Sequence, residues 1–390
     1  MPILFLIVFI DLVGFGLVIP LMPFYAQRFA ASAPEMTMLF ATYSLMSMLT
    51  APLWGRLSDS IGRRPVLMVS MAASALAYLA MAFADGLWVL FLARAFAGAC
   101  AGNIAAAQAY IADVTTPEKR ARGMGMIGAA FGLGFIIGPV VGGVLAGEDI
   151  AHADLETPGL IAAALSAIAC AAVAGQLPES LNRKNRRQAR SRLAVARDAL
   201  SRPVLARLLV MFFLVVLAFS GMETTFAYWA MGEFGWGPRS TGFVFFYVGV
   251  LSAVMQGGLI GVLSRKFGEE RLMLAGLGLI AIGLLVLPLA HDVPVLLVAV
   301  SGLAIGMGAM QPSLNSLISK SVAADEQGEV MGVSQSVGSL SRVLGPLIAG
   351  WLFAGLGRNS PYIWGAVLVL GALMVGWSLS RRRLAPASAE

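Results

Sequence analysis

The sequence is poor in charged residues, cysteine and histidine. Only 12% of its 390 residues are charged, whereas 58% are hydrophobic, and ordinary globular chains carry about 25% charged residues. A chain with so little polar surface cannot cover itself in water, which excludes a set of soluble domains. Two cysteines inside apolar runs, Cys100 and Cys170, exclude a disulfide scaffold. Two histidines in polar breaks, His152 and His291, exclude a zinc domain.

Long apolar runs are what the sequence has instead. About 20 apolar residues are needed to span a bilayer, and runs of this kind predict an all-α membrane protein with 12 transmembrane helices. The expected spans are residues 2–25, 37–57, 65–84, 87–112, 122–147, 158–177, 204–232, 239–264, 271–290, 293–319, 329–355 and 360–380. The first run carries Asp11 in its middle and has no basic start, so we assign it as a span and not as a signal peptide.

Lysine and arginine are distributed unequally between the two sets of loops. Of 27 basic residues, 22 fall in one set of connections, and Arg28, Arg239 and Arg358 fall in the other. The positive-inside rule then places both termini in the cytoplasm and predicts a multi-pass protein of the cytoplasmic membrane. Because the basic residues follow membrane topology, the net charge of +6 does not indicate a nucleic-acid partner.

The two halves of the chain repeat each other. A shift of 206 positions places Gly62 on Gly268, and a shift of 207 places the Gly-Pro pair at 138–139 on the pair at 345–346. Two parallel six-helix halves are a pattern of transporters. We expect an N-terminal six-helix bundle at 1–177, a cytoplasmic linker with an amphipathic portion at 178–203, and a C-terminal six-helix bundle at 204–390.

The connection between the second and third spans carries the most specific motif. It reads Gly55-Arg-Leu-Ser-Asp59-Ser-Ile-Gly62-Arg63-Arg64-Pro65. This order resembles the signature loop of the major facilitator superfamily, in the drug/proton antiporter branch that includes tetracycline efflux pumps. The resemblance implies a cytoplasmic gate. We expect Gly55 to allow close helix approach, Asp59 to meet a helix N-terminus, and Arg63 and Arg64 to pair with acids. A topogenic basic loop is the alternative, but it would not need this order.

Two further acids belong to the gate hypothesis. In the second-half copy of the motif, Arg265 replaces the aspartate and Glu269 replaces the arginine, which predicts a weaker or differently paired gate. Asp113 ends the fourth span close to Lys119 and Arg120. We therefore expect Asp113 to form a gate or an interfacial ion pair, not to bind substrate.

A glycine-rich motif lies in the fifth span. It consists of Gly134, Gly138, Pro139, Gly142 and Gly143. Glycines spaced by four give a flat ridge for tight helix packing, and the proline removes a backbone donor and bends the helix. The run resembles the antiporter motif of the same branch, which implies export over import. Small-residue packing without any transport meaning is the alternative.

Four charged residues fall inside predicted spans, where a charge costs roughly 2.5–3.5 kcal/mol on insertion scales. They are Asp11, Arg94, Glu223 and Arg342. We expect one mixed pair in each half, Asp11 with Arg94 and Glu223 with Arg342, and Glu223 as the main titrating carboxylate. Arg94 with Gly98 also resembles the family's fourth-span motif, whose arginine is tied to proton handling. Static structural ion pairs are the alternative.

Polar and aromatic side chains inside other spans are candidates for lining a substrate cavity. They are Gln108, Tyr228, Tyr247, Gln256, Gln311 and Asn315. Interhelical hydrogen bonds or an interfacial aromatic belt would explain the same residues without a substrate.

These patterns predict a secondary transporter that works by alternating access and is not an enzyme. By the resemblance, an amphipathic or hydrophobic small molecule leaves the cytoplasm in exchange for protons. We expect no cofactor, no metal and a monomer in the lipid bilayer. Tetracycline itself is not the expected substrate, because its pumps carry an aspartate in span nine, whereas Leu272 to Leu289 contains no acid. A metabolite importer or facilitator, a lysolipid translocator and a non-transporting receptor or scaffold remain alternatives.

Overall fold

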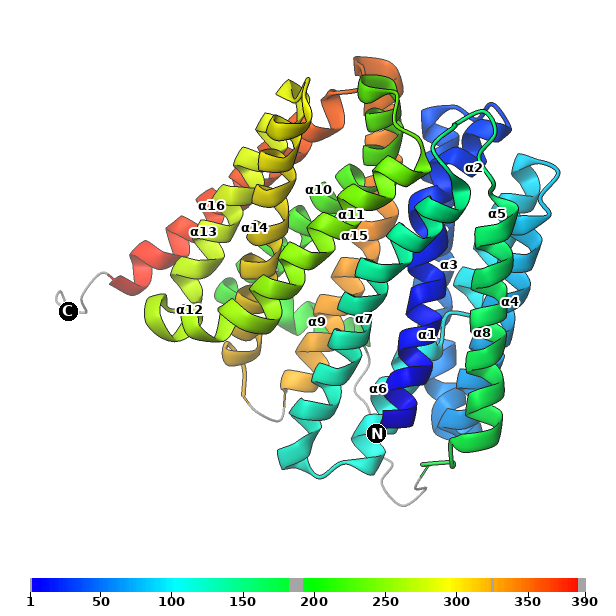
Figure 1. Cartoon of the computed structure of the whole chain (residues 1–390). Helices are drawn as coiled ribbons and strands as arrows, with labels where there is room; N and C mark the ends of the chain where they lie inside the picture. Colours follow the sequence, from blue (N-terminus) through cyan, green and yellow to red (C-terminus); the bar gives the residue numbers. More distant parts are fainter. Residues whose placement is uncertain (1, 182–191, 324–325, 385–390) are drawn as a thin grey trace, which may run out of the picture. The chain divides into compact units, whose positions relative to one another are not determined.

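The computed structural model describes residues 2–181, 192–323 and 326–384, and these residues form helices and no strand. The first half contains α1 (Pro2–Val18), η1 (Ile19–Leu21), α2 (Met22–Arg28), α3 (Ala33–Ile61), α4 (Arg63–Ala82), α5 (Leu87–Ala99), α6 (Asn103–Val114), α7 (Pro117–Ala146) and α8 (Glu156–Gln176). The remainder contains α9 (Arg192–Ser201), α10 (Pro203–Phe234), α11 (Pro238–Val254), η2 (Met255–Leu259), α12 (Ile260–Phe267), α13 (Glu269–Val286), η3 (Leu287–Leu289), α14 (Val293–Lys320), α15 (Gln327–Leu356) and α16 (Ser360–Leu384) (Figure 1).

The predicted all-α class and the 12 spans are confirmed within the described residues. Several boundaries differ from the expected ones by a few residues. The second span runs over Ala33–Ile61, and the third begins at Arg63. The signature motif is therefore mostly helical, and Gly62 alone turns the chain, with φ at 116°. Only glycine adopts this backbone conformation without strain.

The helices group into two compact units by their internal contacts. The first consists of Met1–Arg187 and Phe226–Gly249, and the second of Gln188–Thr225 and Val250–Glu390. The end of α10 and most of α11 thus pack with the first half of the sequence. The bundle boundaries expected from the sequence remain a prediction. Within the expected linker, 192–201 forms α9, and 182–191 lie outside the described residues.

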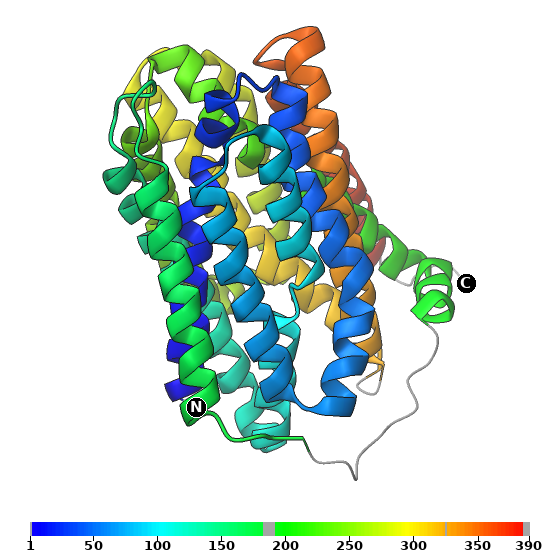
Figure 2. The same ribbon diagram turned by 90° about the vertical axis from the view of Figure 1, so that its right-hand side faces the viewer.

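In the first unit, α1 is packed between α7 and α8, and α4 packs against α8 (Figures 1 and 2). Glycines allow the backbones of α1 and α7 to touch. A Cβ atom at Gly138 would lie 2.5 Å from the carbonyl carbon of Gly16, and one at Gly134 would lie 2.9 Å from that of Leu12. The tight packing expected of the glycine motif is confirmed. Without water to exclude, helices in lipid associate through such close contact.

In the second unit, α13 packs against both α14 and α16. The α13–α14 contact again uses small residues. A Cβ atom at Gly276 would lie 2.7 Å from the carbonyl oxygen of Gly306, and one at Gly283 would lie 2.8 Å from that of Ala299. These two helices therefore form a rigid pair in the second unit.

Four of the described spans are not continuous α-helices. The first contains the 3₁₀ turn η1, and the ninth ends in the 3₁₀ turn η3. The fourth is interrupted between α5 and α6 at 100–102, and the eighth contains the π-helical turn Met255–Leu259. Backbone groups freed by the interruption of the fourth span are bound by side chains. Ser70 Oγ accepts from Gly102 N at 3.0 Å, and Trp54 Nε1 donates to Ala99 O at 2.6 Å. Interrupted spans are tolerated in a membrane only where neighbouring groups satisfy the backbone in this way. Such interruptions often mark functional sites.

Replacing Gly138 by alanine tests the α1–α7 contact. We expect the Gly138→Ala variant to lose about 1–3 kcal/mol of stability, because the added methyl overlaps the Gly16 backbone. Gly132→Ala is the matched control on the same helix, since Gly132 has no neighbouring atom within 4 Å of its Cβ position. Thermal unfolding in detergent measures both. Equal unfolding temperatures for the two variants would contradict the packing argument.

Candidate functional site

Asp11 lies on α1 and is only 5% exposed. Its carboxylate is held by two neutral side chains: Asn103 Nδ2 donates to Oδ2, and Ser166 Oγ donates to Oδ1 at 3.3 Å. Asn103 is the first residue of α6, so the interruption of the fourth span delivers this amide to α1. Ser166 comes from α8. The buried carboxylate is thus oriented by hydrogen bonds and has no cation among its partners.

Arg94 lies on α5, is 3% exposed and does not pair with Asp11, so the expected Asp11–Arg94 pair is wrong. Its guanidinium lies over the Tyr43 ring, 4.4 Å from the centroid, and Nε donates to Leu39 O at 3.4 Å. The reason is the packing of α5, because Gly98 contacts the carbonyl oxygen of Tyr43 and brings this face of α5 onto α3. Tyr78 lies within electrostatic reach of both Asp11 and Arg94.

Glu223 and Arg342 belong to the second unit, on α10 and α15. Arg342 lies within electrostatic reach of Glu223, and the expected ion pair between them remains a prediction. Glu223 is half-buried beside buried Ser220 and Thr224, whereas Arg342 is exposed. The second unit therefore holds its intramembrane acid next to a cation, while the first holds Asp11 with neutral groups only.

The six residues expected to line a cavity are divided between the units. Gln108, Tyr228 and Tyr247 lie in the first, and Gln256, Gln311 and Asn315 lie in the second. Gln108 and Gln256 are exposed and the other four are half-buried. Gln256 lies on the π-helical turn of the eighth span. That these residues face one substrate remains a prediction.

The signature motif forms an ion-pair cluster around Arg63. This side chain is only 10% exposed; Nη1 lies 2.5 Å from Asp59 Oδ1, and Nε lies 3.0 Å from Asp113 Oδ2. Ser58 Oγ accepts from the same Nη1 at 3.0 Å. The predicted pairing of Arg63 with acids, and the ion pair of Asp113, are confirmed.

Three details of the motif differ from the prediction. Gly55 faces open space and makes no close helix contact. Asp59 meets the Arg63 side chain, four residues along the chain, and not a helix N-terminus. Arg64 donates to the carbonyl oxygen of Ala174 and forms no pair with an acid. Since Gly62 alone makes the turn, Gly55 and Asp59 are still part of α3, and this decides which groups they meet.

The helix N-terminus that Asp59 was expected to meet is occupied by Glu179. Its two carboxylate oxygens accept from Arg63 N at 2.9 Å and Arg64 N at 3.1 Å, the first residues of α4. Ser180 N and Leu181 N also donate to Glu179 Oε1. Partial burial raises the pKa of the Glu179 carboxyl, but the four backbone donors outweigh it and hold the pKa below its ordinary value of 4.5.

The second unit carries the same cluster with the charges exchanged. Gly268 again turns the chain with positive φ, at 79°. The first residue of the following helix is now an acid, Glu269, which lies 2.7 Å from Lys320 Nζ and accepts from Ser316 Oγ at 2.7 Å. Arg265 donates to the Gly261 carbonyl oxygen instead of forming an ion pair. The second-half copy of the motif is therefore paired differently from the first, as predicted.

A carboxylate cap also joins α7 to α11 within the first unit. Glu148 follows α7, and its oxygens accept from Gly237 N at 3.0 Å and Ser240 N at 2.9 Å, at the start of α11. Arg239 N donates to Gly147 O at 3.0 Å. Below the cap, Gly143 contacts Pro238 and Gly242 contacts Pro139. One face of the glycine motif thus packs on α1 and the adjacent face packs on α11.

Comparison with known proteins identifies the family. The sequence matches the profile of the Major Facilitator Superfamily over residues 4–345 and, in a second match, over 257–389. The chain belongs to the major facilitator superfamily. It is 32% identical to the tetracycline resistance protein, class C, of Escherichia coli, covering 93% of each chain, and 29% identical to multidrug resistance protein 2 of Bacillus subtilis, covering 93% and 91%. The crystal structure of the human organic anion transporter MFSD10 matches with a TM-score of 0.72 at 25% identity, covering 96% and 98%.

Membership in the major facilitator superfamily makes this chain a multi-pass membrane transporter of small molecules and not an enzyme. The superfamily resemblance drawn from the signature motif is confirmed.

Sequence reasoning missed four residues of this geometry: Asn103, Ser166, Glu148 and Glu179. Asn103 and Ser166 carried a weak signal, as isolated polar residues in apolar runs. Glu148 and Glu179 carried no signal in the sequence other than their position just after a span. Acids in loops near a membrane surface are common, so that position alone did not single them out. Their role depends on which distant helix begins beside them.

Replacing Glu179 by glutamine tests the cap on α4. The carboxyl has a lowered pKa in the folded state, so its stabilisation is present above its ordinary value of 4.5 and is lost as the pH falls through the lowered pKa. We expect Glu179→Gln to cost about 1 kcal/mol or less at pH 7, because the carboxylate is exposed. In acid the difference from wild type should vanish.

Thermal unfolding in detergent measures the effect of Glu179→Gln at pH 7 and at an acidic pH below the lowered pKa of Glu179. Asp85→Asn, an exposed loop acid without a hydrogen bond among the described residues, is the control and should change little at either pH. A Glu179→Gln deficit that grew on acidification would contradict the assigned sign.

Proposed function

We propose that the protein exports an amphipathic or hydrophobic small molecule from the cytoplasm in exchange for protons, by alternating access. Asp11 and Glu223 bind the coupling proton. The observation that carries the proposal is the Asp11 carboxylate, buried in a span with Asn103 and Ser166 and no cation. A charge buried in a membrane requires neutralisation. For Asp11 a proton is the available neutralising partner.

Glu223 serves the complementary role in the second unit. Its interaction with Arg342 gives the carboxylate a partner that protonation would release. Proton binding to either acid would then change the electrostatics of its unit, which is how a proton gradient drives a conformational cycle. Arg94 lies over the Tyr43 ring and acts as a positioning residue in this scheme.

The names of relatives support export and leave the substrate broad. Two relatives are named for resistance to tetracycline and to multiple drugs, and export of a toxic compound would confer such resistance. Tetracycline pumps carry an aspartate in the ninth span. In this chain the ninth span is formed by α13, which contains no acid after Glu270. We therefore propose an amphipathic compound other than tetracycline, and a carrier in the cytoplasmic membrane with both termini inside.

Neutralising Asp11 and Glu223 in turn tests the coupling. In liposomes that contain a pH dye, substrate from a panel of cationic, neutral and anionic amphiphiles should trigger proton flux with wild-type protein. We expect Asp11→Asn and Glu223→Gln to reduce that flux at least about tenfold, since each removes a protonatable group. Asp85→Asn, outside the spans, should retain it.

The alternatives give different results in the same vesicles. Substrate movement that ignores the proton gradient would contradict coupling and indicate a facilitator. Acid-dependent accumulation in the direction of proton movement would indicate an importer, and transport restricted to long-chain lipids would indicate a lysolipid translocator. No movement of any compound would favour a receptor or scaffold. Flux lost in Glu223→Gln but kept in Asp11→Asn would place the proton on Glu223 alone.

Alternating access requires that the Glu148 cap on α11 open and close. The basic loops place this cap on the side opposite the Arg63 cluster, because Glu148 follows the fifth span and Asp113 ends the fourth at the other face. We propose that the cap holds the extracytoplasmic side closed. Removing it would shift the equilibrium towards the open state by about 1 kcal/mol, which is about fivefold in population.

Hydrogen exchange tests the cap directly. In Glu148→Ala, the amides of Gly237 and Ser240 should exchange faster than in wild type, because their acceptor is gone. Asp149→Ala is the matched control, since this neighbouring acid pairs with His152 at 2.7 Å and contacts no part of α11. Unchanged exchange in Glu148→Ala, or equal acceleration in both variants, would refute the cap.

A further inference from the structure

Arg94 is a buried cation that has no anionic partner among the described residues. Its side chain is 3% exposed, and the groups within its electrostatic reach are two tyrosines, Tyr43 and Tyr78. Nε donates to Leu39 O, but neither Nη1 nor Nη2 donates to any described residue. A charge buried in a membrane is costly unless a counter-charge accompanies it. Arg94 therefore has one charge and two nitrogen donors available for an anion from outside the chain.

Three aromatic rings from three different helices lie beside this guanidinium. Tyr43 on α3 lies under it, with Arg94 Cζ 4.4 Å from the ring centroid. The centroid of the Phe15 ring on α1 is 6.0 Å from that of Tyr43 and 5.9 Å from that of Phe135 on α7. All three aromatic side chains are half-buried, so each keeps surface for another molecule. A guanidinium beside aromatic surface matches a ligand that joins a carboxylate to an aromatic ring.

Close helix contacts hold these groups in place before any ligand binds. Gly98 lies against the Tyr43 backbone and so keeps α5, with its guanidinium, on α3. Gly138 lies against α1 and keeps α7 beside it. Phe15 follows Asp11 by four residues on α1, so the two side chains project from the same side of that helix. The aromatic surface is therefore preorganised in the first unit, one helical turn from the proposed proton site.

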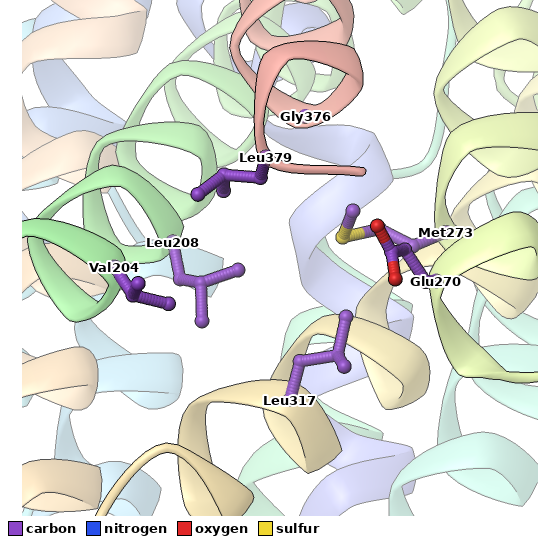
Figure 3. A pocket seen from close by; sticks show the side chains of 7 residues that line it. All are labelled: Val204, Leu208, Glu270, Met273, Leu317, Gly376 and Leu379. Carbon is purple, nitrogen blue, oxygen red and sulfur yellow. The ribbon is translucent and has the colours of Figure 1, made fainter. Parts of the chain in front are cut away.

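The pocket of the second unit does not offer an anion such a site. It lies between α10, α13, α14 and α16, and its single charged lining residue among the described ones is Glu270 (Figure 3). The other side chains around it are apolar: Val204, Leu208, Met273, Leu317 and Leu379. A carboxylate beside an apolar wall repels an anionic ligand. The two places therefore differ in the sign of the charge that they would accept.

We propose that Arg94 binds the carboxylate of an aromatic acid, and that the exported amphiphile is an aromatic monoanion. Nη1 and Nη2 donate to the two carboxylate oxygens, and the aromatic part packs against Phe15, Tyr43 and Phe135. This inference rests on the proposed function and names the substrate class of the same carrier. An amide of the same ring system keeps the aromatic contacts and loses the charge, whereas an alkyl acid keeps the charge and loses those contacts.

Isothermal titration calorimetry of the full chain in detergent at pH 7 tests the site without a proton gradient. The probes are 2-naphthoate, 2-naphthamide and octanoate, and the heat measured in protein-free detergent is subtracted. We expect wild-type protein to bind 2-naphthoate about tenfold more tightly than 2-naphthamide, the effect of one bidentate charge-assisted pair. Binding should also be about threefold tighter than that of octanoate, because the rings contact an aromatic ligand better.

Two variants assign these preferences to the site. Arg94→Gln should bring the affinities for 2-naphthoate and 2-naphthamide close together. Phe15→Leu keeps an apolar side chain without the ring, and should weaken 2-naphthoate about threefold while leaving octanoate unchanged. Arg271→Gln, which removes an exposed arginine at the start of α13, is the control and should keep both preferences. Thermal unfolding checks that each variant is folded, and Phe15→Leu tests the site independently of Arg94.

Three results would overturn the proposal. They are equal wild-type affinities for 2-naphthoate and 2-naphthamide, a preference for the acid that survives in Arg94→Gln, and a 2-naphthoate affinity that rises in Glu270→Gln. The last would place the ligand in the pocket of the second unit, because removing the acid there would relieve repulsion. Because binding is measured without proton flux, the aromatic-acid site can fail while export in exchange for protons stands, and the reverse.

Discussion

The absence of water from the hydrocarbon core is the constraint on which the rest of this structure depends. Every polar group in a span must find its partner within the protein. Where the fourth span is interrupted, Ser70 and Trp54 take up the freed backbone groups. Where Asp11 interrupts an apolar helix, Asn103 and Ser166 hold its carboxylate. At both places, polar groups inside the spans are held by specific neighbours.

The same constraint explains the glycines of α7. Helices in lipid gain little from burying apolar side chains, so they associate where backbones come close. Gly134 and Gly138 place α7 against α1 and so fix the helix that carries Asp11. The adjacent face, at Pro139 and Gly143, contacts α11. One short motif thus joins the helix that carries Asp11 to a helix from the second half of the sequence.

The two halves of the chain share the positions of their motifs more strictly than the charges. Gly62 and Gly268 both turn the chain with positive φ. After the turn, the first half has Arg63 paired with Asp113, whereas the second half has Glu269 paired with Lys320. An ion pair between the same two places works with either sign, because only the attraction matters. The helix N-termini and loops next to these two ion pairs also differ. A substitution near one ion pair can therefore act on it without acting on the other.

The sequence by itself determined the membrane class, the 12 spans and the superfamily, because these follow from residue composition and from motifs that are local in the chain. It also predicted that Arg63 pairs with acids, but the structure identified those acids as Asp59 and Asp113. Only the tertiary structure decided that Asp11 meets Asn103 and not Arg94. The hydrophobic pattern of the sequence shows that a residue lies in a span. It does not show towards which neighbouring helix an interrupted helix directs that residue's side chain. The caps formed by Glu148 and Glu179 were also decided only by the tertiary structure. Each cap joins a loop to a helix far away in sequence, and such contacts depend on how the helices pack in three dimensions.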